Sequence, residues 1–339
     1  MTSEALAVGG KNAGGFDAKK TVGWLIGIGI WFLPLFWIDL TTYLVLTVSG
    51  VTMGMLLFLT ASGLTLIFGL MDVLNLAHGA FFAWGGYAGF SVLNILQRLG
   101  WVETAGVVQS LADLALVLAA ALAVGLVLGV ILERIVIRGV YGNHLKQILI
   151  TMGASLIMAE LIRIFWGPND EVPPVPAALL GSWDFNDVVV DKFRGTAIVI
   201  GLGVFVVIQL VLRKTKLGVI VRAGVENKEM VQAMGYDIHK IFTGVFAAGA
   251  GLAAVGGAMW AMFKQQIHPA MGEENLIFAL IIVIIGGLGS VTGSFLGAIM
   301  VGLAFNYVAF LMPKLALGVN IMIMTIILLW RPTGLFGRD

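Results

Sequence analysis

The stretch GLMDVLNLAHGAFFAWGGY, residues 69 to 87, places an acid, an amide and an imidazole inside a long apolar region. From Tyr43 to Gln97 no charged residue or histidine occurs outside this stretch. A continuous helix over this region would be about 80 Å long, whereas two membrane crossings need about 60 Å. The surplus predicts a break between two membrane-spanning helices, and the polar cluster from Asp72 to Gly79 occupies the position of that break.

The composition of the whole chain agrees with a membrane protein. Of its 339 residues 59% are hydrophobic and 12% are charged, against about 25% charged residues in soluble domains. We therefore predict an all-α, polytopic helical membrane protein with about eight to ten transmembrane helices, some of them broken or re-entrant. The apolar segments cover residues 21–38, 43–70, 76–97, 112–133, 147–166, 195–212, 241–263, 275–288, 293–312 and 316–330.

Basic residues predict the orientation, because Lys and Arg accumulate in cytoplasmic loops. Fourteen of the 20 basic residues fall on one side of a ten-crossing topology: Lys11, Lys19, Lys20, Arg134, Arg138, Lys146, Arg213, Lys214, Lys216, Arg222, Lys228, Lys240, Arg331 and Arg338. Both termini are thus expected in the cytoplasm. Residues 1–20 are expected to form a flexible cytoplasmic tail, and residues 21–339 a single transmembrane domain whose first span is retained and not cleaved as a signal peptide.

Several classes of function are disfavoured by what the sequence lacks. A formal net charge of +1 gives no indication of a nucleic-acid partner, and without cysteine there is no disulfide, thiolate metal site or Cys nucleophile. No HExxH or G-x-S-x-G motif occurs, so no catalytic residue and no metal site are predicted. The Gly-rich GGLGSVTGS is not followed by Lys and is no Walker phosphate loop. If the chain moves a solute, the energy must therefore come from ATPase partners or from an ion gradient.

The polar cluster has several readings on residue chemistry alone. An Asp at the centre of a lipid-facing helix costs roughly 2.5 to 3.5 kcal/mol on insertion scales, so we expect Asp72 near the cytoplasmic boundary. Asn75 and His78 are three residues apart and share a helix face, and we expect them to enter the bundle. The alternatives are a wet cytoplasmic turn, a histidine that caps a helix break, or a proton relay of Asp72 and His78 in an ion-coupled secondary transporter.

Two loops stand out. The loop at 213–240 contains apolar residues at helical spacing, including Met230, Val231 and Met234, with Gly235 where a helix would end. It predicts a short amphipathic helix that lies on lipid or, as we favour, inserts into a groove of a protein partner. The loop at 166–195 is predicted to be periplasmic. It is either a solvated loop with interfacial Trp166 and Trp183 or a docking or gating element.

Small residues and one charge pair complete the pattern. Gly289, Gly293 and Gly297 recur every fourth residue, which favours close helix packing over hinge motion. The stretch GGLGSVTG, 286–293, is also a plausible turn between two short spans. Glu160 and Arg163, spaced by three residues near the outer end of their span, are expected to pair and snorkel.

Four motifs together resemble one known family. LNLAHGAFFAWGGY (74–87), RAGVENKEMVQAMGYDIHKI (222–241), IIGGLGSVTGSFLGA (284–298) and RPTGLFGR (331–338) are similar, in this order along the chain, to segments of the branched-chain amino acid ABC permeases of the LivH type. The resemblance covers roughly residues 41 to 338. It does not extend to the first 20 residues or to the details of the loop at 166–195.

The resemblance implies an importer subunit of the bacterial inner membrane. Such permeases pair with a second, related permease and two cytoplasmic ATPases, take substrate from a periplasmic binding protein, and bind no cofactor, because ATP is used by the partners. The substrate would be a branched-chain or other small amino acid, an amide or a small organic acid.

The resemblance also implies roles for particular residues. Asp72, Asn75, His78 and Gly79 would lie at the solute pathway or its inner gate. Residues for coupling to the ATPases would be Arg222, Glu226, Asn227, Met230, Val231, Met234 and Gly235. In this interpretation Val231 and Met234 fill a groove of the ATPase, while Arg222 and Glu226 fix the register.

Overall fold

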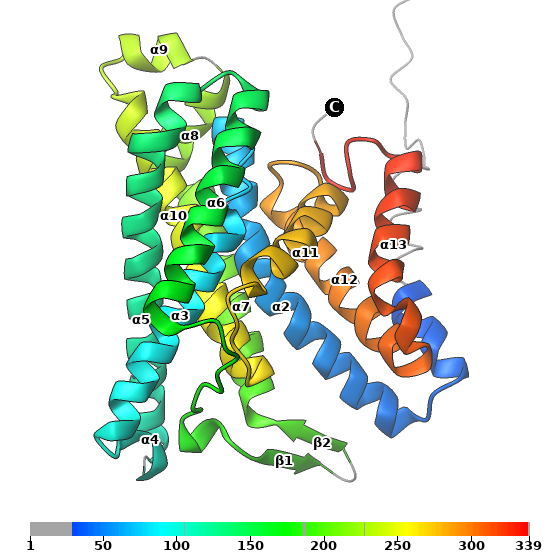
Figure 1. The fold of residues 1–339 in the computed structure, drawn as a ribbon. Helices are drawn as coiled ribbons and strands as arrows, with labels where there is room; N and C mark the ends of the chain where they lie inside the picture. Colours follow the sequence, from blue (N-terminus) through cyan, green and yellow to red (C-terminus); the bar gives the residue numbers. More distant parts are fainter. Residues whose placement is uncertain (1–28, 105, 186–187, 227, 338–339) are drawn as a thin grey trace, which may run out of the picture.

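The fold is a bundle of helices with one small hairpin (Figure 1), and it is described by a computed structural model for residues 29–104, 106–185, 188–226 and 228–337. The helices are α2 (Leu40–Met71), α3 (His78–Arg98), α4 (Trp101–Thr104), α5 (Val107–Leu132), α6 (His144–Trp166), α7 (Lys192–Lys214), α8 (Lys216–Glu226), α9 (Lys228–Ala233), α10 (Ile238–Lys264), α11 (Met271–Gly286), α12 (Val291–Leu311) and α13 (Ala316–Trp330). A π-helical turn (Glu133–Ile137) extends α5, and β1 (Ser182–Phe185) pairs antiparallel with β2 (Val188–Asp191).

The predicted class of a polytopic helical membrane protein is confirmed. Seven helices of the described part are long and apolar enough to cross a membrane: α2, α3, α5 with its extension, α6, α7, α10 and α12. With 16 and 15 residues, α11 and α13 are shorter than the roughly 20 residues of a full crossing. The predicted tail at 1–20 and residues 21–28 of the predicted span at 21–38 lie outside the described residues; the described rest of that span includes a short 3-10 helix, Leu33–Phe36.

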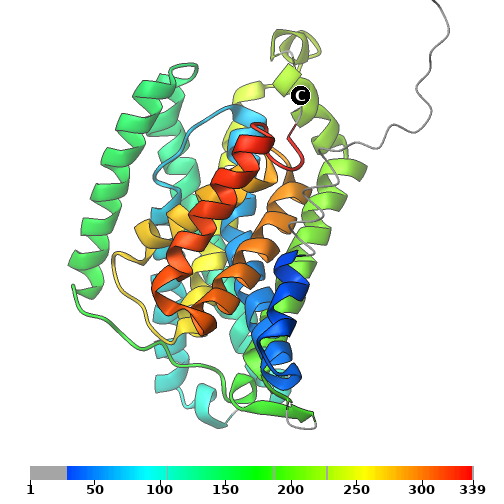
Figure 2. The same cartoon turned by 90° about the vertical axis from the view of Figure 1, so that its right-hand side faces the viewer.

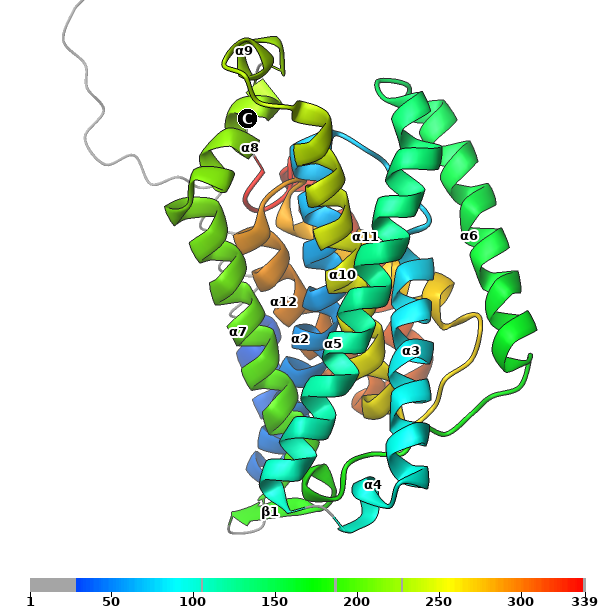
Figure 3. The same cartoon turned by 90° about the vertical axis from the view of Figure 1, so that its left-hand side faces the viewer.

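The bundle has two distinct ends. In Figure 1 the α8–α9 pair and the C-terminal segment lie at the top, which we call the α9 end, and the β1–β2 hairpin with α4 lies at the bottom, the hairpin end. The long α2 and α10 form the centre of the bundle, and α3, α5 and α12 pack around them. By contrast α6 stands apart from the other helices in Figures 2 and 3. Most apolar side chains of α6 are exposed.

Small residues let the central helices approach closely. A Cβ on Gly63 of α2 would overlap the carbonyl oxygen of Gly249 of α10, and a Cβ on Gly129 of α5 would lie 2.8 Å from the Ala247 Cα. Association of helices in lipid depends on such packing, because the lipid tails are as apolar as the helix surface. The small-residue stretch 247–258 therefore fixes α10 between α2 and α5.

The glycines at every fourth position are not all on one helix ridge. Gly293 and Gly297 lie in α12 and face α11, where a Cβ on Gly297 would be 3.1 Å from the Ile282 carbonyl oxygen. Gly289 instead lies in the turn before α12, with φ +81° that favours glycine, and it faces Gly69 of α2. The predicted turn is thus present, but only α11 before it is short, because α12 has 21 residues. The ridge is limited to the later two glycines.

The chain outside the spans is also packed. At the α9 end the N–H groups of Leu335 and Phe336 donate to the carbonyls of Ile285 (2.9 Å) and Gly286 (3.0 Å), so the C-terminal segment satisfies the last turn of α11. At the hairpin end Trp166 donates to the Ser91 hydroxyl at 2.9 Å and is packed within the protein, whereas Trp183 is 45% exposed. The predicted pairing of Glu160 with Arg163 is present.

A broken helix crossing as candidate functional site

The polar cluster lies at a break between two helices that reaches deep into the bundle. After Met71 the chain leaves α2 through Asp72, whose φ is 55°, and α3 begins only at His78. The His78 Nε2 atom lies 2.9 Å from the carbonyl oxygen of Thr60, which precedes Met71 by 11 residues. That distance along α2 is about 16 Å, roughly half of a 30 Å hydrocarbon core. The segment 72–77 therefore descends from the α9 end to mid-depth (Figure 3).

This non-helical segment is held by side chains of α6. The Leu74 N–H donates to Gln147 Oε1 at 3.2 Å, and the Leu76 N–H donates to the Thr151 hydroxyl at 3.1 Å. Both α6 side chains are fully buried. Irregular backbone is stable at membrane depth only where protein or water satisfies it, so these bonds explain how the break persists. Gln147 and Thr151 were not among the predicted residues, although two polar residues four apart on one helix face were a visible signal.

As expected, Asp72 is exposed to solvent, whereas Asn75 and His78 are buried in the bundle. Asp72 is exposed, with Oδ2 3.5 Å from Nε2 of His144, while Asn75 is 2% exposed and His78 is fully buried. A carbonyl only accepts hydrogen bonds, so His78 carries its proton on Nε2. Asp72 is therefore paired with His144, and among the described residues it forms no hydrogen bond with His78. This geometry gives no support to a direct proton relay between the two.

At Gly79 the first turn of α3 lies against the first turn of α11. A Cβ on Gly79 would overlap the carbonyl oxygen of Gly272, and a Cβ on Gly272 would overlap that of Gly79. Gly272 lies in the first turn of α11, which is reached from the hairpin end through residues 265–270. Two half-crossings thus meet at about the same depth. Sequence reasoning missed Gly272, because it placed the span at 275–288; a 14-residue span is itself too short to cross and was the available signal.

Several buried polar atoms near the crossing have spare hydrogen-bonding capacity. Within the described residues no partner is found for Thr60 Oγ1, Asn75 Nδ2, His78 Nδ1 or Asn275 Oδ1. Asn75 uses its oxygen to accept from the Ala77 N–H at 3.1 Å, and Asn275 uses its nitrogen to donate to the Met271 carbonyl at 2.8 Å. The set offers neutral donors and acceptors and no buried charge, which is compatible with a polar solute that carries no net charge.

The second predicted site, the loop at 213–240, forms two helices instead of the single short helix expected. Gly235, with φ 86°, ends α9. Its N–H donates to the Gln232 carbonyl at 2.9 Å, and the Tyr236 N–H donates to the Val231 carbonyl at 3.2 Å. This is the Schellman arrangement, in which glycine takes the left-handed position after a helix. The predicted role of Gly235 as the end of the helix is confirmed.

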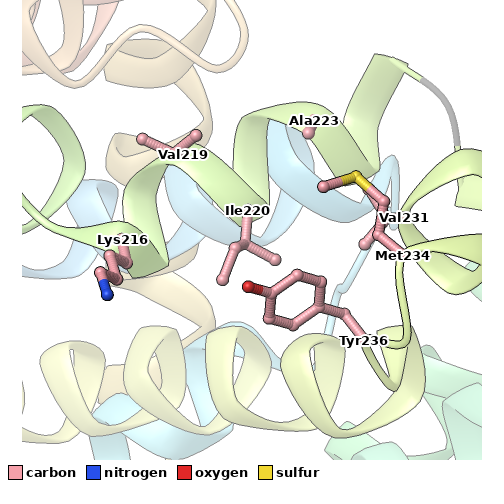
Figure 4. A pocket seen from close by; sticks show the side chains of 7 residues that line it. All are labelled: Lys216, Val219, Ile220, Ala223, Val231, Met234 and Tyr236. Atoms are coloured by element: carbon pink, nitrogen blue, oxygen red, sulfur yellow. The ribbon is translucent and has the colours of Figure 1, made fainter.

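The α8–α9 pair encloses a mainly apolar groove at the α9 end (Figure 4). Its volume is about 220 Å³, and its lining includes Val219, Ile220, Val231, Met234 and Tyr236. Met234 is 68% exposed, but Val231 is 1% exposed and packs in the chain's own core with Ile238 and Phe242. The expectation that Val231 enters a partner's groove is therefore wrong, because the backbone turn at α9 directs it inward.

The other predicted coupling residues are only partly described. Met230 is 54% exposed on α9. The backbone of Arg222 and Glu226 belongs to α8, but the positions of their side chains lie outside the described structure, as does the whole of Asn227. Among the predicted coupling residues whose side chains are described, Met230 and Met234 are thus the ones exposed on the α9 end.

Comparison with known proteins places this architecture among transport permeases. The sequence profile of the family described as branched-chain amino acid transport system, permease component, matches residues 46–329. The chain is 27% identical to the permease protein BraD of Pseudomonas aeruginosa, over 87% of this chain and 96% of that protein. It is 24% identical to LivH (86% and 94%) and 26% identical to LivM (85% and 69%) of Escherichia coli. No solved structure matches the chain.

Proposed function

Because the chain belongs to the family of branched-chain amino acid transport permeases, we propose that it works in the inner membrane as one of two related permeases of an ABC importer. The importer would take a small polar solute from a periplasmic binding protein, and two cytoplasmic ATPases would drive it. The solute is a branched-chain or other amino acid, an amide or a small organic acid. Its relatives BraD, LivH and LivM are described as permeases of high-affinity branched-chain amino acid transport systems.

The observation that carries the proposal is the α8–α9 pair. Met230, Met234 and Tyr236 are exposed there next to an apolar groove, which suits docking of an ATPase better than binding to lipid. The described part of the basic loops and the C-terminal segment lie at the same end, which favours a cytoplasmic α9 end. Motion of the ATPases would then act on the α8–α9 pair first.

A series of contacts leads from this pair to the broken crossing. Val231 of α9 and Phe242 of α10 belong to the same buried cluster. The residue after Phe242, Thr243, donates to the buried Glu133 carboxylate at 2.6 Å. The other Glu133 oxygen accepts from the Tyr141 hydroxyl at 2.7 Å. Tyr141 lies three residues before the start of α6, whose side chains hold the segment 73–77. This continuous series of contacts supports the proposal that closure of the ATPases would move the segment before His78.

The test uses the complete importer, purified with both permeases and both ATPases and reconstituted with the binding protein. We expect co-purification and solute-stimulated ATP hydrolysis. Met234→Asp should reduce the stimulated rate about tenfold or more, because a carboxylate would replace an apolar contact. Met312→Asp, at a methionine of similar exposure (59% against 68%) directly after α12, should leave the stimulated rate unchanged. Proton-driven uptake by this chain alone, or full coupling in Met234→Asp, would contradict the proposal.

A further inference from the structure

The last turns of α5 form an irregular joint with α10 and with the loop before α6. Instead of ending as an α-helix, α5 continues through the π-helical turn Glu133–Ile137 and the 3-10 turn Arg138–Val140. The sequence ERIVI of the π-helical turn contains no glycine or proline that would impose this geometry. Such turns are rare and occur frequently at functional sites. We therefore attribute this turn to its tertiary contacts.

A buried carboxylate holds the joint together without a cation. Glu133 is fully buried and accepts hydrogen bonds from the hydroxyls of Tyr141 and of Thr243 in α10. Burial and the bond to Glu133 raise the pKa of the Tyr141 phenol above its usual range, so the phenol keeps its proton and donates. Among the described residues no basic side chain forms an ion pair with Glu133, and its neighbours Arg134 and Arg138 are exposed. Two neutral hydroxyls thus satisfy the carboxylate.

One of these two bonds can be exchanged for another. The Thr243 hydroxyl has one hydrogen but two acceptors within reach, the Glu133 carboxylate and the carbonyl oxygen of His239, which lies one turn earlier in α10 at 2.9 Å. If α10 moves away from the π-helical turn, Thr243 therefore keeps a hydrogen bond within its own helix. An ion pair in this place would instead leave two desolvated charges on separation. The joint can thus open without leaving the threonine unpaired.

Both ends of the joint continue into elements that the proposed function uses. On one side, residues 234–237 alone connect α9 to α10. On the other side, Val140 directly precedes Tyr141, and its carbonyl accepts from Gln147 Nε2 at 3.3 Å. The same Gln147 side chain accepts from the Leu74 N–H through Oε1. The joint therefore lies between the exposed α8–α9 pair and the backbone of the broken crossing.

We propose that Glu133, Tyr141 and Thr243 form a releasable joint that transmits displacement of α10 to α6 during transport, with Glu133 as its positioning residue. The inference rests on the proposed function, because the ATPases must supply the displacement. A contact that only stabilises the fold would affect stability, ATP hydrolysis and transport together. A joint that transmits motion affects the number of solute molecules moved per ATP hydrolysed.

The experiment measures uptake of radiolabelled leucine and ATP hydrolysis by the complete importer, reconstituted in vesicles with its binding protein. Thr243→Val and Tyr141→Phe each remove one hydroxyl and keep the shape of the side chain, including the Tyr141 ring on Phe242. We expect each variant to lower uptake per ATP about fivefold or more while hydrolysis stays within about twofold. Thr243→Ser retains the hydroxyl and should keep the normal ratio. The matched control is Thr196→Val on α7, because Thr196 is half-buried like Thr243 and bonds only to the Lys192 carbonyl in its own helix.

The double variant and the thermal midpoint separate a joint from a structural contact. Because both hydroxyls act through one carboxylate, Thr243→Val combined with Tyr141→Phe should lower uptake per ATP little beyond either single variant. Normal uptake per ATP in both single variants overturns the inference. A loss of uptake that only follows a lower thermal midpoint and slower hydrolysis overturns it as well. If the ATPases do not co-purify with the two permeases, the proposed function fails instead.

Discussion

The two half-crossings reach the same depth from opposite ends but carry different chemistry. The amide of Asn75 before α3 and the imidazole of His78 at the start of α3 are buried. The first turn of α11, by contrast, exposes the two carboxylates of Glu273 and Glu274. A neutral polar group can be buried when a hydrogen bond within the protein replaces its bond to water, as the bond from His78 to the Thr60 carbonyl does. Ionised carboxylates lose far more on desolvation. The comparison indicates that the α3 half is built into the fold and that the α11 half is built for contact with water.

The largest expected effect comes from separating the two halves. Gly79→Ala or Gly272→Ala would place a Cβ onto the backbone of the other helix, and we expect a loss of more than about 3 kcal/mol in the free energy of unfolding. The measurement is the thermal midpoint and the monodisperse yield of the purified complex. Gly153→Ala on α6, where a Cβ meets nothing within 4 Å, should be neutral or slightly stabilising. A normal midpoint for Gly79→Ala would show that the halves do not need to touch.

The sequence revealed one half of this crossing and not the other for a physical reason. Asp72, Asn75 and His78 stand out because apolar residues surround them for two helix lengths, and length alone predicted a break. Glu273 and Glu274 precede an apolar run, so they resemble residues of an ordinary water-exposed helix end. Only the tertiary contact of Gly272 with Gly79 shows that this helix end lies at mid-depth. The inward turn of Val231 was equally invisible, because its spacing matches that of the exposed Met234.

The second expected effect tests the buried half. His78→Ala removes the hydrogen bond to Thr60 and leaves a cavity among fully buried side chains, which we expect to cost about 2 to 4 kcal/mol. His78→Gln, whose amide can donate to the same carbonyl, should retain more of the stability. His239→Ala, at an exposed position on α10, should change it by less than about 0.5 kcal/mol. Equal stability of His78→Ala and His239→Ala would remove the structural role assigned to the imidazole.

The third effect concerns the support that side chains of α6 give to the α3 half. Gln147→Leu and Thr151→Val each leave a backbone N–H of the segment 73–77 without its acceptor, at an expected cost of about 1 to 3 kcal/mol each. Because both bonds hold one segment, the double variant should lose less than the sum of the two losses. Thr325→Val on α13 removes only a hydroxyl bond within one exposed helix and is the control. Strict additivity of the two α6 variants would indicate that the segment does not move as a unit.

The smallest effect compares the two asparagines, one from each half. Asn75 accepts from the Ala77 N–H within the break, so Asn75→Ala leaves a buried donor unpaired and should cost about 1 to 2 kcal/mol. Asn275 only adds a bond to the carbonyl of Met271 in its own helix, so Asn275→Ala should cost less than about 1 kcal/mol.

Solute-stimulated ATP hydrolysis of the complete importer then tells the roles of the two halves apart. If the unpaired Oδ1 of Asn275 binds the solute, Asn275→Ala should lower the stimulated rate of ATP hydrolysis severalfold while the stability stays nearly unchanged. In Asn75→Ala, by contrast, any loss of rate should accompany a loss of stability. The control is Asn275→Asp, which keeps an oxygen at that position. If Asn275→Ala hydrolyses ATP normally and is as unstable as Asn75→Ala, both halves belong to the fold alone, and the distinction between a buried structural half and a water-facing half has to be given up.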